Sequence, residues 1–190
     1  MSEQLQSDFD KIVKNSKFSN KEIQLKKDFL NKFIESGFPN RKQEDWKFLD
    51  ISQIIKKNIS DLSYFIDYSQ SNKIDPFTFV DGLEHNKIIF LNGRIEKIDF
   101  NHEDKSKIEI SDETKKDISF NYENSLIDLN SAFTDKVFKI LVKKDYSLTK
   151  PLIIYHSTND SIKSTNINLR LDFELGENSC LKLIDYFANN

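Results

Sequence analysis

Thiol and imidazole side chains, which bind zinc and iron–sulfur clusters or act as nucleophiles, are few and scattered in this chain of 190 residues. Cys180 is the only cysteine, and the three histidines are His85, His102 and His156. Thiolates and imidazoles hold metals when several of them lie close together, as in C-x-x-C or H-x-x-x-H spacing, and these four residues show no such spacing. We therefore expect no metal or cofactor to be bound by this chain alone. We interpret the histidines as surface or satisfied core residues, and Cys180 as a buried or edge structural thiol.

Glu44, Asp45 and Trp46 place two carboxylates beside an aromatic ring, which is one way to build an acid/base site. The alternative, which we favour, is structural: Trp46 and Phe48 pack a helical hairpin onto a β-core while the neighbouring charged side chains stay solvated or form local pairs. With only four glycines, the chain has no Gly-rich loop for phosphates, which argues against an ATPase or a dehydrogenase. We predict that the protein is not an enzyme.

Composition indicates a globular chain with a polar surface. It contains 37% hydrophobic residues, including sixteen Phe, and 31% charged residues with a formal net charge of −3. Lys is interleaved with Asp and Glu, which argues against a nucleic-acid footprint, because such a footprint needs basic residues gathered on one face. The N-terminus lacks a secretory signal, and no run approaches the ~18 apolar residues of a membrane span. A single cysteine fits a reducing compartment, and we expect a cytoplasmic protein.

Two amphipathic helices are predicted at the start of the chain. Apolar residues recur at helical spacing over 3–15 and 21–36, with Asn20 as the N-cap of the second helix. Gly37 followed by Pro39 is a common way to end such a helix. The pair should form a helical hairpin.

The rest of the chain shows further helices and several strands. Shorter helices are expected at 51–59, with Asp50 or Ser52 near the cap, and at 121–134. Asn92-Gly93 between two apolar runs is the signature of a two-residue β-hairpin, because both residues tolerate positive φ. Four strands are predicted after residue 135, at 137–142, 152–155, 165–174 and 179–187.

The predicted strand at 165–174 alternates strictly, with Ile167, Leu169, Leu171 and Phe173 facing one side, so one face should be buried and the other solvated. The spacing between strand starts suggests solenoid rungs. Periodicity alone leaves a β-sandwich open. We expect three parts: a helical region at 1–80, a hairpin and linker helix at 81–134, and the start of a β-solenoid at 135–190.

One local string has the character of a family signature. From Gly37 to Phe48 the sequence is Gly-Phe-Pro-Asn-Arg-Lys-Gln-Glu-Asp-Trp-Lys-Phe. It resembles the N-terminal motif of the SufD branch of the SufB/SufD family of iron–sulfur cluster assembly scaffolds, in which Gly-x-Pro precedes Arg-Lys-x-Glu-x-Trp-Lys and an aromatic residue. Segments 88–94, 128–133 and 148–154 follow in the family's order. The matching residues are Gly37, Pro39, Arg41, Lys42, Glu44, Trp46, Lys47, Asn92, Gly93, Arg94, Asn130, Phe133, Lys150 and Pro151.

This resemblance implies an α+β fold, with the helical hairpin followed by the first rungs of a right-handed β-helix. It also implies a scaffold that pairs with SufB and the ATPase SufC, the iron–sulfur cluster being handled by the full complex. The family's proteins are longer, so we expect this chain to be truncated, to lack the site for SufC, and to self-associate through an open β-helix end.

Three alternatives stay open beside the SufD-like scaffold. The first is a SufB-like scaffold, against which the single cysteine argues. The second is a β-helical carbohydrate-active enzyme, for which the strand region offers only the scattered carboxylates Asp172, Glu174 and Asp185. The third is a β-helical or β-sandwich binding module unrelated to cluster assembly.

Overall fold

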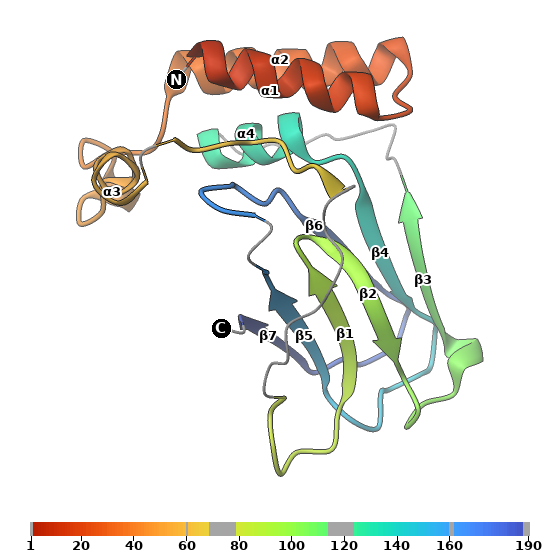
Figure 1. The fold of residues 1–190 in the computed structure, drawn as a ribbon. Helices are drawn as coiled ribbons and strands as arrows, with labels where there is room; N and C mark the ends of the chain where they lie inside the picture. The colour runs from red at the N-terminus through yellow and green to blue at the C-terminus, as the bar shows by residue number, and fades with distance from the viewer. Residues whose placement is uncertain (1, 60, 69–78, 114–123, 160–161, 188–190) are drawn as a thin grey trace. The chain divides into compact units, whose positions relative to one another are not determined.

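Helices come first along the chain and strands dominate after residue 85 in the computed structural model, which describes residues 2–59, 61–68, 79–113, 124–159 and 162–187 (Figure 1). The chain divides into two compact units. The helical unit contains Met1–Ile66, Thr114–Lys136 and Ser164–Arg170, and the sheet unit contains Asp67–Glu113, Val137–Lys163 and Leu171–Asn190. Each unit is therefore assembled from separate stretches of sequence.

The helical unit begins with the two predicted helices. Its elements are α1 (Ser2–Asn15), α2 (Asn20–Ser36), the 3₁₀ turn η1 (Glu44–Trp46), α3 (Ile51–Asn58) and α4 (Ser125–Phe133). The N-cap of α2 is Ser19 rather than Asn20, because Ser19 and Glu22 form a reciprocal capping box. Gly37 ends the same helix with φ of 69°, and its N–H donates to the Phe33 carbonyl.

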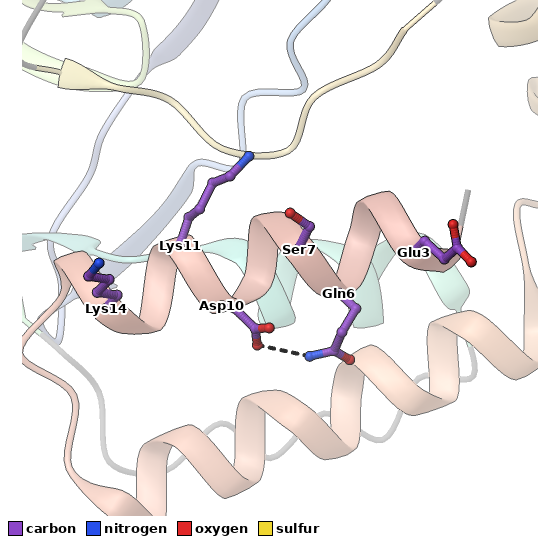
Figure 2. Close-up of a pocket in the computed structure, with 6 residues that line it drawn as sticks. All are labelled: Glu3, Gln6, Ser7, Asp10, Lys11 and Lys14. Carbon is purple, nitrogen blue, oxygen red and sulfur yellow. Dashed lines mark hydrogen bonds between the residues drawn. The ribbon is translucent and has the colours of Figure 1, made fainter.

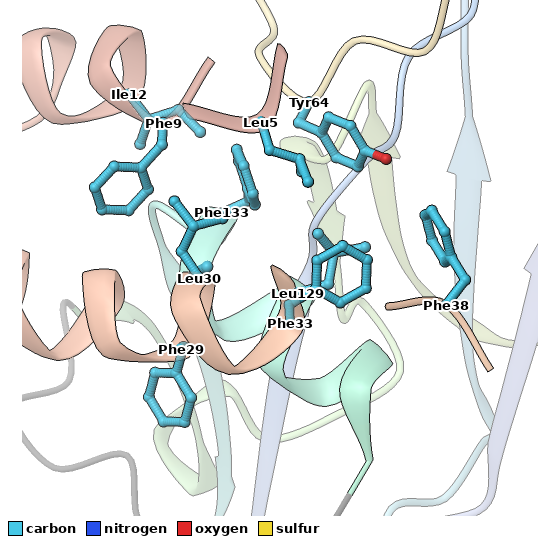
Figure 3. Packing of buried hydrophobic residues seen from close by; sticks show 11 residues of the cluster. Leu5, Phe9, Ile12, Phe29, Leu30, Phe33, Phe38, Tyr64, Leu129 and Phe133 are labelled. Carbon is cyan, nitrogen blue, oxygen red and sulfur yellow. The ribbon is translucent and has the colours of Figure 1, made fainter. Parts of the chain in front are cut away.

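Apolar side chains of the helices converge in one aromatic-rich core (Figure 3). Helices α1 and α2 run antiparallel (Figure 1), which fits the predicted hairpin, and α4 packs mainly against α2. Phe133 of α4 lies edge-on to Phe9, with ring centroids 6.2 Å apart, and 5.2 Å from the Tyr64 ring. The cluster consists of Leu5, Phe9, Ile12, Phe29, Leu30, Phe33, Phe38, Tyr64, Leu129, Ala132 and Phe133.

A buried carboxylate fastens a distant segment to α1. The Asp8 side chain is fully buried and accepts hydrogen bonds from the Tyr64 backbone N–H at 2.8 Å, Lys11 Nζ at 2.7 Å and Gln4 Nε2 at 2.9 Å. Burial alone would raise the pKa of Asp8, but these hydrogen bonds outweigh it and hold the pKa below its usual value. Asp8 thus holds residues 63–64 on the helix as an ion.

A buried lysine caps the C-terminal end of α4. Lys26 of α2 is 6% exposed, and its Nζ donates to the carbonyls of Ser131, at 3.1 Å, and Thr134. The C-terminus of a helix presents unpaired carbonyls and partial negative charge, so a cation is stabilised there. Burial nevertheless lowers the pKa of Lys26 to about 8, against the opposing effect of two nearby carboxylates, Asp135 and Glu22.

The sheet unit consists of two small sheets. Its strands are β1 (Asn86–Leu91), β2 (Arg94–Asp99), β3 (Ile108–Glu113), β4 (Val137–Val142), β5 (Leu152–Ser157), β6 (Arg170–Leu175, entering the unit at Leu171) and β7 (Leu183–Phe187). One sheet has the order β2-β1-β5-β7 and the other β3-β4-β6. Pairing is antiparallel for β1/β2 and β3/β4, and parallel for β1/β5 and β5/β7. Phe90 of β1 meets Phe138 of β4 with centroids 5.2 Å apart, so the two sheets share a core.

The prediction of a right-handed β-helix is wrong. The described strands form two small sheets, one of mixed direction, and none of them closes into a solenoid. A period of two shows which face of a strand is buried but not which strand lies beside it. In a solenoid, neighbouring strands are parallel. Here the edge strands β2 and β3 instead pair antiparallel with β1 and β4. Because there is no β-helix, the expectation that the chain self-associates through an open β-helix end at β7 is withdrawn.

Local predictions fare better than long-range ones. The hairpin is confirmed, because Asn92 and Gly93 join β1 to β2 with φ of 51° and 83°. The predicted strand at 165–174 is replaced by β6, which begins only at Arg170. The first four residues of β6 are half-buried and the last two are exposed, so its two faces do not differ as predicted. Part of the predicted helix at 121–134 lies outside the described residues, and α4 accounts for the remainder.

Candidate functional site

The segment with the family-like signature begins where α2 ends. The next residue after Gly37, Phe38, is buried with its ring 5.0 Å from that of Phe33, and Pro39 is buried beside it. These contacts anchor the start of the segment in the helical core.

Beyond Pro39 the backbone folds into a series of tight turns. Backbone N–H groups donate from Gln43 to Asn40 at 3.1 Å, from Trp46 to Gln43 at 2.9 Å, and from Leu49 to Trp46 at 2.8 Å. The Asn40 side chain also accepts from the Lys42 N–H at 3.0 Å. The backbone of this segment is therefore held in one conformation by its own hydrogen bonds.

Charged side chains of this segment are exposed, as predicted, and Lys47 Nζ pairs with Glu44 Oε1 at 2.6 Å. Trp46 is half-buried, but Phe48 is 87% exposed, with Lys47 Nζ 5.3 Å from its ring centroid. The interpretation that Phe48 packs into a core is therefore wrong. The Glu44 carboxylate is exposed to water and already paired with Lys47, which makes it a poor candidate for an acid/base catalyst.

Asn130 and Phe133, also in the helical unit, have structural contacts. Asn130 Nδ2 donates to the Leu169 carbonyl at 3.2 Å, and Asn130 Oδ1 accepts from Thr134 Oγ1 at 2.9 Å. Phe133 lies in the aromatic core at 3% exposure. Both residues hold α4 in place.

The remaining signature residues belong to the sheet unit and lie at two ends of the same strands. Asn92 follows β1, where its N–H donates to the Ser157 carbonyl at 2.9 Å, and Arg94 stacks on the Tyr68 ring at 4.2 Å. Pro151 precedes β5, and its carbonyl accepts from the N–H of Asn86 at 2.9 Å. Six strand residues separate the two groups, which is roughly 20 Å. The structure therefore does not gather them into one site.

Lys150 belongs to a polar cluster around Glu103 that the sequence analysis missed. The Glu103 carboxylate accepts from Asn86 Nδ2 at 2.8 Å, from Tyr146 Oη at 2.7 Å, from the N–H and Oγ1 of Thr149 at 3.0 Å each, and from the N–H of Lys150 at 3.0 Å. Burial would raise its pKa, but these bonds lower it to about 2. Because the Glu103 carboxylate already accepts all of these hydrogen bonds, it anchors a loop and is a poor proton acceptor. Nothing local distinguishes this glutamate, because its partners lie up to 47 residues away.

The histidines and the cysteine are not assembled into a metal centre. His85 Nε2 contacts Tyr155 Oη at 2.8 Å, while His156 Nε2 pairs with Asp185 Oδ1 at 2.6 Å and stacks on the Phe187 ring. Cys180 is exposed, in a parallel bridge to Ser147, so it is an edge thiol rather than a buried one. In the described part of the chain, no three His, Cys, Asp or Glu side chains converge as metal ligands.

An open recess of about 520 Å³ lies along α1 (Figure 2). All of its lining residues come from this one helix, and Gln6 Nε2 donates to Asp10 Oδ1 at 3.0 Å within it. They are Glu3, Gln6, Ser7, Asp10, Lys11 and Lys14. Because no second element adds convergent groups, the recess is a solvated helix face rather than a binding cavity.

No protein-family model and no curated protein matches this chain. Among the residues that the structure describes, no helix is long and apolar enough to cross a membrane. The exposed turn from Arg41 to Leu49 is the feature with most of the character of a functional site.

Proposed function

We propose that this chain is a SufD-like component of the SUF iron–sulfur cluster assembly scaffold. It acts by protein–protein assembly with SufB, through which SufC joins the complex, the cluster being handled by the complex as a whole. In this proposal the chain performs no catalytic step of its own.

The observation that carries the proposal is the signature segment itself. Its Arg-Lys-x-Glu-x-Trp-Lys string lies on a hydrogen-bonded turn with five exposed charged side chains and an aromatic ring that is 87% exposed. A fixed, solvent-facing turn with an aromatic residue suits binding to another protein. The occupied Glu103 carboxylate and the dispersed histidines fit a role without catalysis.

The test is to tag the gene product at its chromosomal locus in the source organism and isolate it under anaerobic conditions. We expect SufB and SufC to be recovered with it, and we expect deletion of the gene to lower the activity of cluster-dependent enzymes such as aconitase. An untagged strain is the control for recovery. Absence of SufB together with unchanged aconitase activity would overturn the proposal.

A second candidate is a binding module unrelated to cluster assembly. The observation that favours it is the arrangement of the described strands in two small sheets with the Phe90–Phe138 contact between them. The same isolation separates the two candidates, because a free-standing module would be recovered without SufB.

A further inference from the structure

Three apolar side chains are exposed at the entrance to α3. Phe48 is 87% exposed, Leu49 43% and Ile54 46%. Asp50 caps the helix by accepting from the Gln53 N–H at 3.0 Å. Leu49 is then the residue before the cap and Ile54 the fourth residue of the helix, two positions whose side chains adjoin in a hydrophobic staple. Leu49 and Ile54 thus occupy positions that a hydrophobic staple brings together, and Phe48 is next to Leu49 in the sequence.

These three side chains are not part of the helical core. Helix α3 contacts the aromatic core through Ile51 and Ile55, which are half-buried one turn apart on its inner side, and it has no fully buried residue. Ile54 lies about 100° around the helix from Ile55, on the flank. Single exposed apolar residues are ordinary, but three of them on one short, hydrogen-bonded segment indicate an interaction site.

Basic residues predominate in the segment that carries these apolar side chains. Segment 41–57 has five basic residues and three carboxylates, in a chain whose formal net charge is −3. Glu44 is paired with Lys47, and Asp50 caps the helix. Within the described ranges no carboxylate lies within ion-pair distance of the four other cations. These are Arg41, Lys42, Lys56 and Lys57.

We propose that Phe48, Leu49 and Ile54, with these four cations, form a docking surface for an acidic amphipathic helix of a partner protein. The apolar stripe of such a helix covers the Phe48 ring, the most exposed apolar side chain, and carboxylates on the flanks of the stripe meet the unpaired cations. Lys57 follows Ile54 by three residues and so lies on the same side of α3. The inference depends only on this surface, and it applies whether or not the assembly is the SUF scaffold.

Two other occupants fit less well. An anionic membrane would draw Glu44 and Asp45, which flank the aromatic residues, toward lipid headgroups of the same charge. A second copy of the chain in a two-fold interface would place the basic surface against itself. A helix with carboxylates is the complement that the local charge requires.

The test uses the ¹⁵N-labelled chain and two synthetic peptides of about 18 residues, long enough to form a helix. Both peptides have leucines at i, i+3, i+4 and i+7, with glutamates on the flanks of one and lysines on the flanks of the other. We expect the glutamate peptide to shift backbone amide signals within residues 46–57, and its affinity to fall with added salt. We expect no binding of the lysine peptide.

Substitutions then locate the site. Phe48→Ser should weaken binding of the glutamate peptide at least tenfold, since one central aromatic residue commonly dominates such a contact. The double variant K56E/K57E should weaken it as well. Leu83→Ser, at a leucine that is 41% exposed in the sheet unit, is the matched control and should leave binding unchanged. Unchanged thermal unfolding of each variant shows that the fold is intact.

Three outcomes would overturn the proposal. The first is a glutamate peptide that does not bind, shifts signals elsewhere, or binds the Phe48→Ser chain with full affinity. The second is binding of the chain to vesicles of phosphatidylcholine and phosphatidylglycerol that is lost in Phe48→Ser, which would assign the surface to a membrane. The third is sedimentation showing concentration-dependent association that Phe48→Ser abolishes, which would assign it to a second copy.

Discussion

The two units of this molecule are stabilised in different ways. In the helical unit, segments far apart in sequence meet around an aromatic core, and single buried charges tie them together: Asp8 binds residue 64, and Lys26 binds residues 131 and 134. In the sheet unit, ladders of backbone hydrogen bonds connect the strands, and its organising carboxylate, Glu103, lies in loops rather than in the core. Stability should therefore depend on a few side chains in the first unit and be distributed over the backbone in the second.

The largest effect is expected from Phe133→Ala in the helical core. The ring is 3% exposed and contacts two other aromatic rings, so its loss should lower the free energy of unfolding by about 4 kcal/mol. Ile154→Ala in the sheet unit should cost about 3 kcal/mol. Urea denaturation of both variants measures the difference, with Phe48→Ala as an exposed control near zero. A larger loss for Ile154→Ala would contradict the comparison.

Asp8→Asn should cost about 3 kcal/mol, because an amide offers hydrogen-bond donors where the carboxylate accepts from Lys11 and Gln4. The pKa of Asp8 is lowered in the fold, so its contribution is present at neutral pH and is lost as the pH falls through that lowered pKa. The variant should lack this acid-dependent loss. Asp10→Asn, on the exposed face of the same helix, should cost below about 0.5 kcal/mol.

Glu103→Gln should cost less, about 1.5 kcal/mol, because the loop that it anchors lies outside the strand ladders. The pKa of Glu103 falls from 4.5 to about 2 on folding. Its stabilisation is therefore complete above about pH 4.5 and disappears as the pH drops toward 2. Unfolding measured across that window should be flatter for the variant, whereas Glu96→Gln, at an exposed glutamate of β2, should follow the parent protein. A variant as acid-sensitive as the parent would show that Glu103 is not the anchor.

Lys26→Met is expected to change stability at pH 7 by less than about 1 kcal/mol, since an apolar residue of similar length avoids the cost of burying a charge. The pKa of Lys26 is about 8 in the fold against 10.5 for a free lysine. The unfolded chain thus binds more protons between these values, and stability rises with pH from about 8.

Tyr64 sets the upper limit of the pH range in which this rise can be seen. Its pKa is raised to about 12 in the fold, so above about pH 10 the unfolded chain loses that proton first and stability falls. Denaturation at intervals between pH 8 and 10 should show the rise in the parent and in Lys27→Met, which changes an exposed neighbour, but not in Lys26→Met. A rise of equal slope in Lys26→Met would exclude Lys26 as its source.

Sequence patterns predicted the local elements of the fold and not its long-range pairing. The helical periods, the Gly37 stop, the Asp50 cap and the Asn92-Gly93 turn are governed by residues within four positions of each other. The choice of neighbours for β5, and the capture of α4 by Lys26, depend on residues separated by up to 108 positions. The residues near each strand in the sequence do not indicate which strand it pairs with. For this reason a β-helix was predicted where two small sheets are present.

The candidate site was predicted only in part. The string from Arg41 to Phe48 was identified from its residues, but Phe48 was assigned to a core because an aromatic residue is usually buried. Phe48 lies instead between the hydrogen-bonded turn at Trp46 and the Asp50 cap of α3, where it is exposed. Ile54, Lys56 and Lys57 were not singled out, because their exposure depends on which face of α3 packs against the core.

The interleaving of the two units also has a consequence for how this protein is made. Leu5 and Phe9 leave the ribosome early, yet their core partner Phe133 is synthesised roughly 6 to 25 s later at elongation rates of 5–20 residues per second. During that interval the apolar faces of α1 and α2 have no α4 to cover them. We expect the nascent chain to need a chaperone such as trigger factor or Hsp70 until α4 has emerged, and slow codons before residue 133 to lengthen its exposure to aggregation.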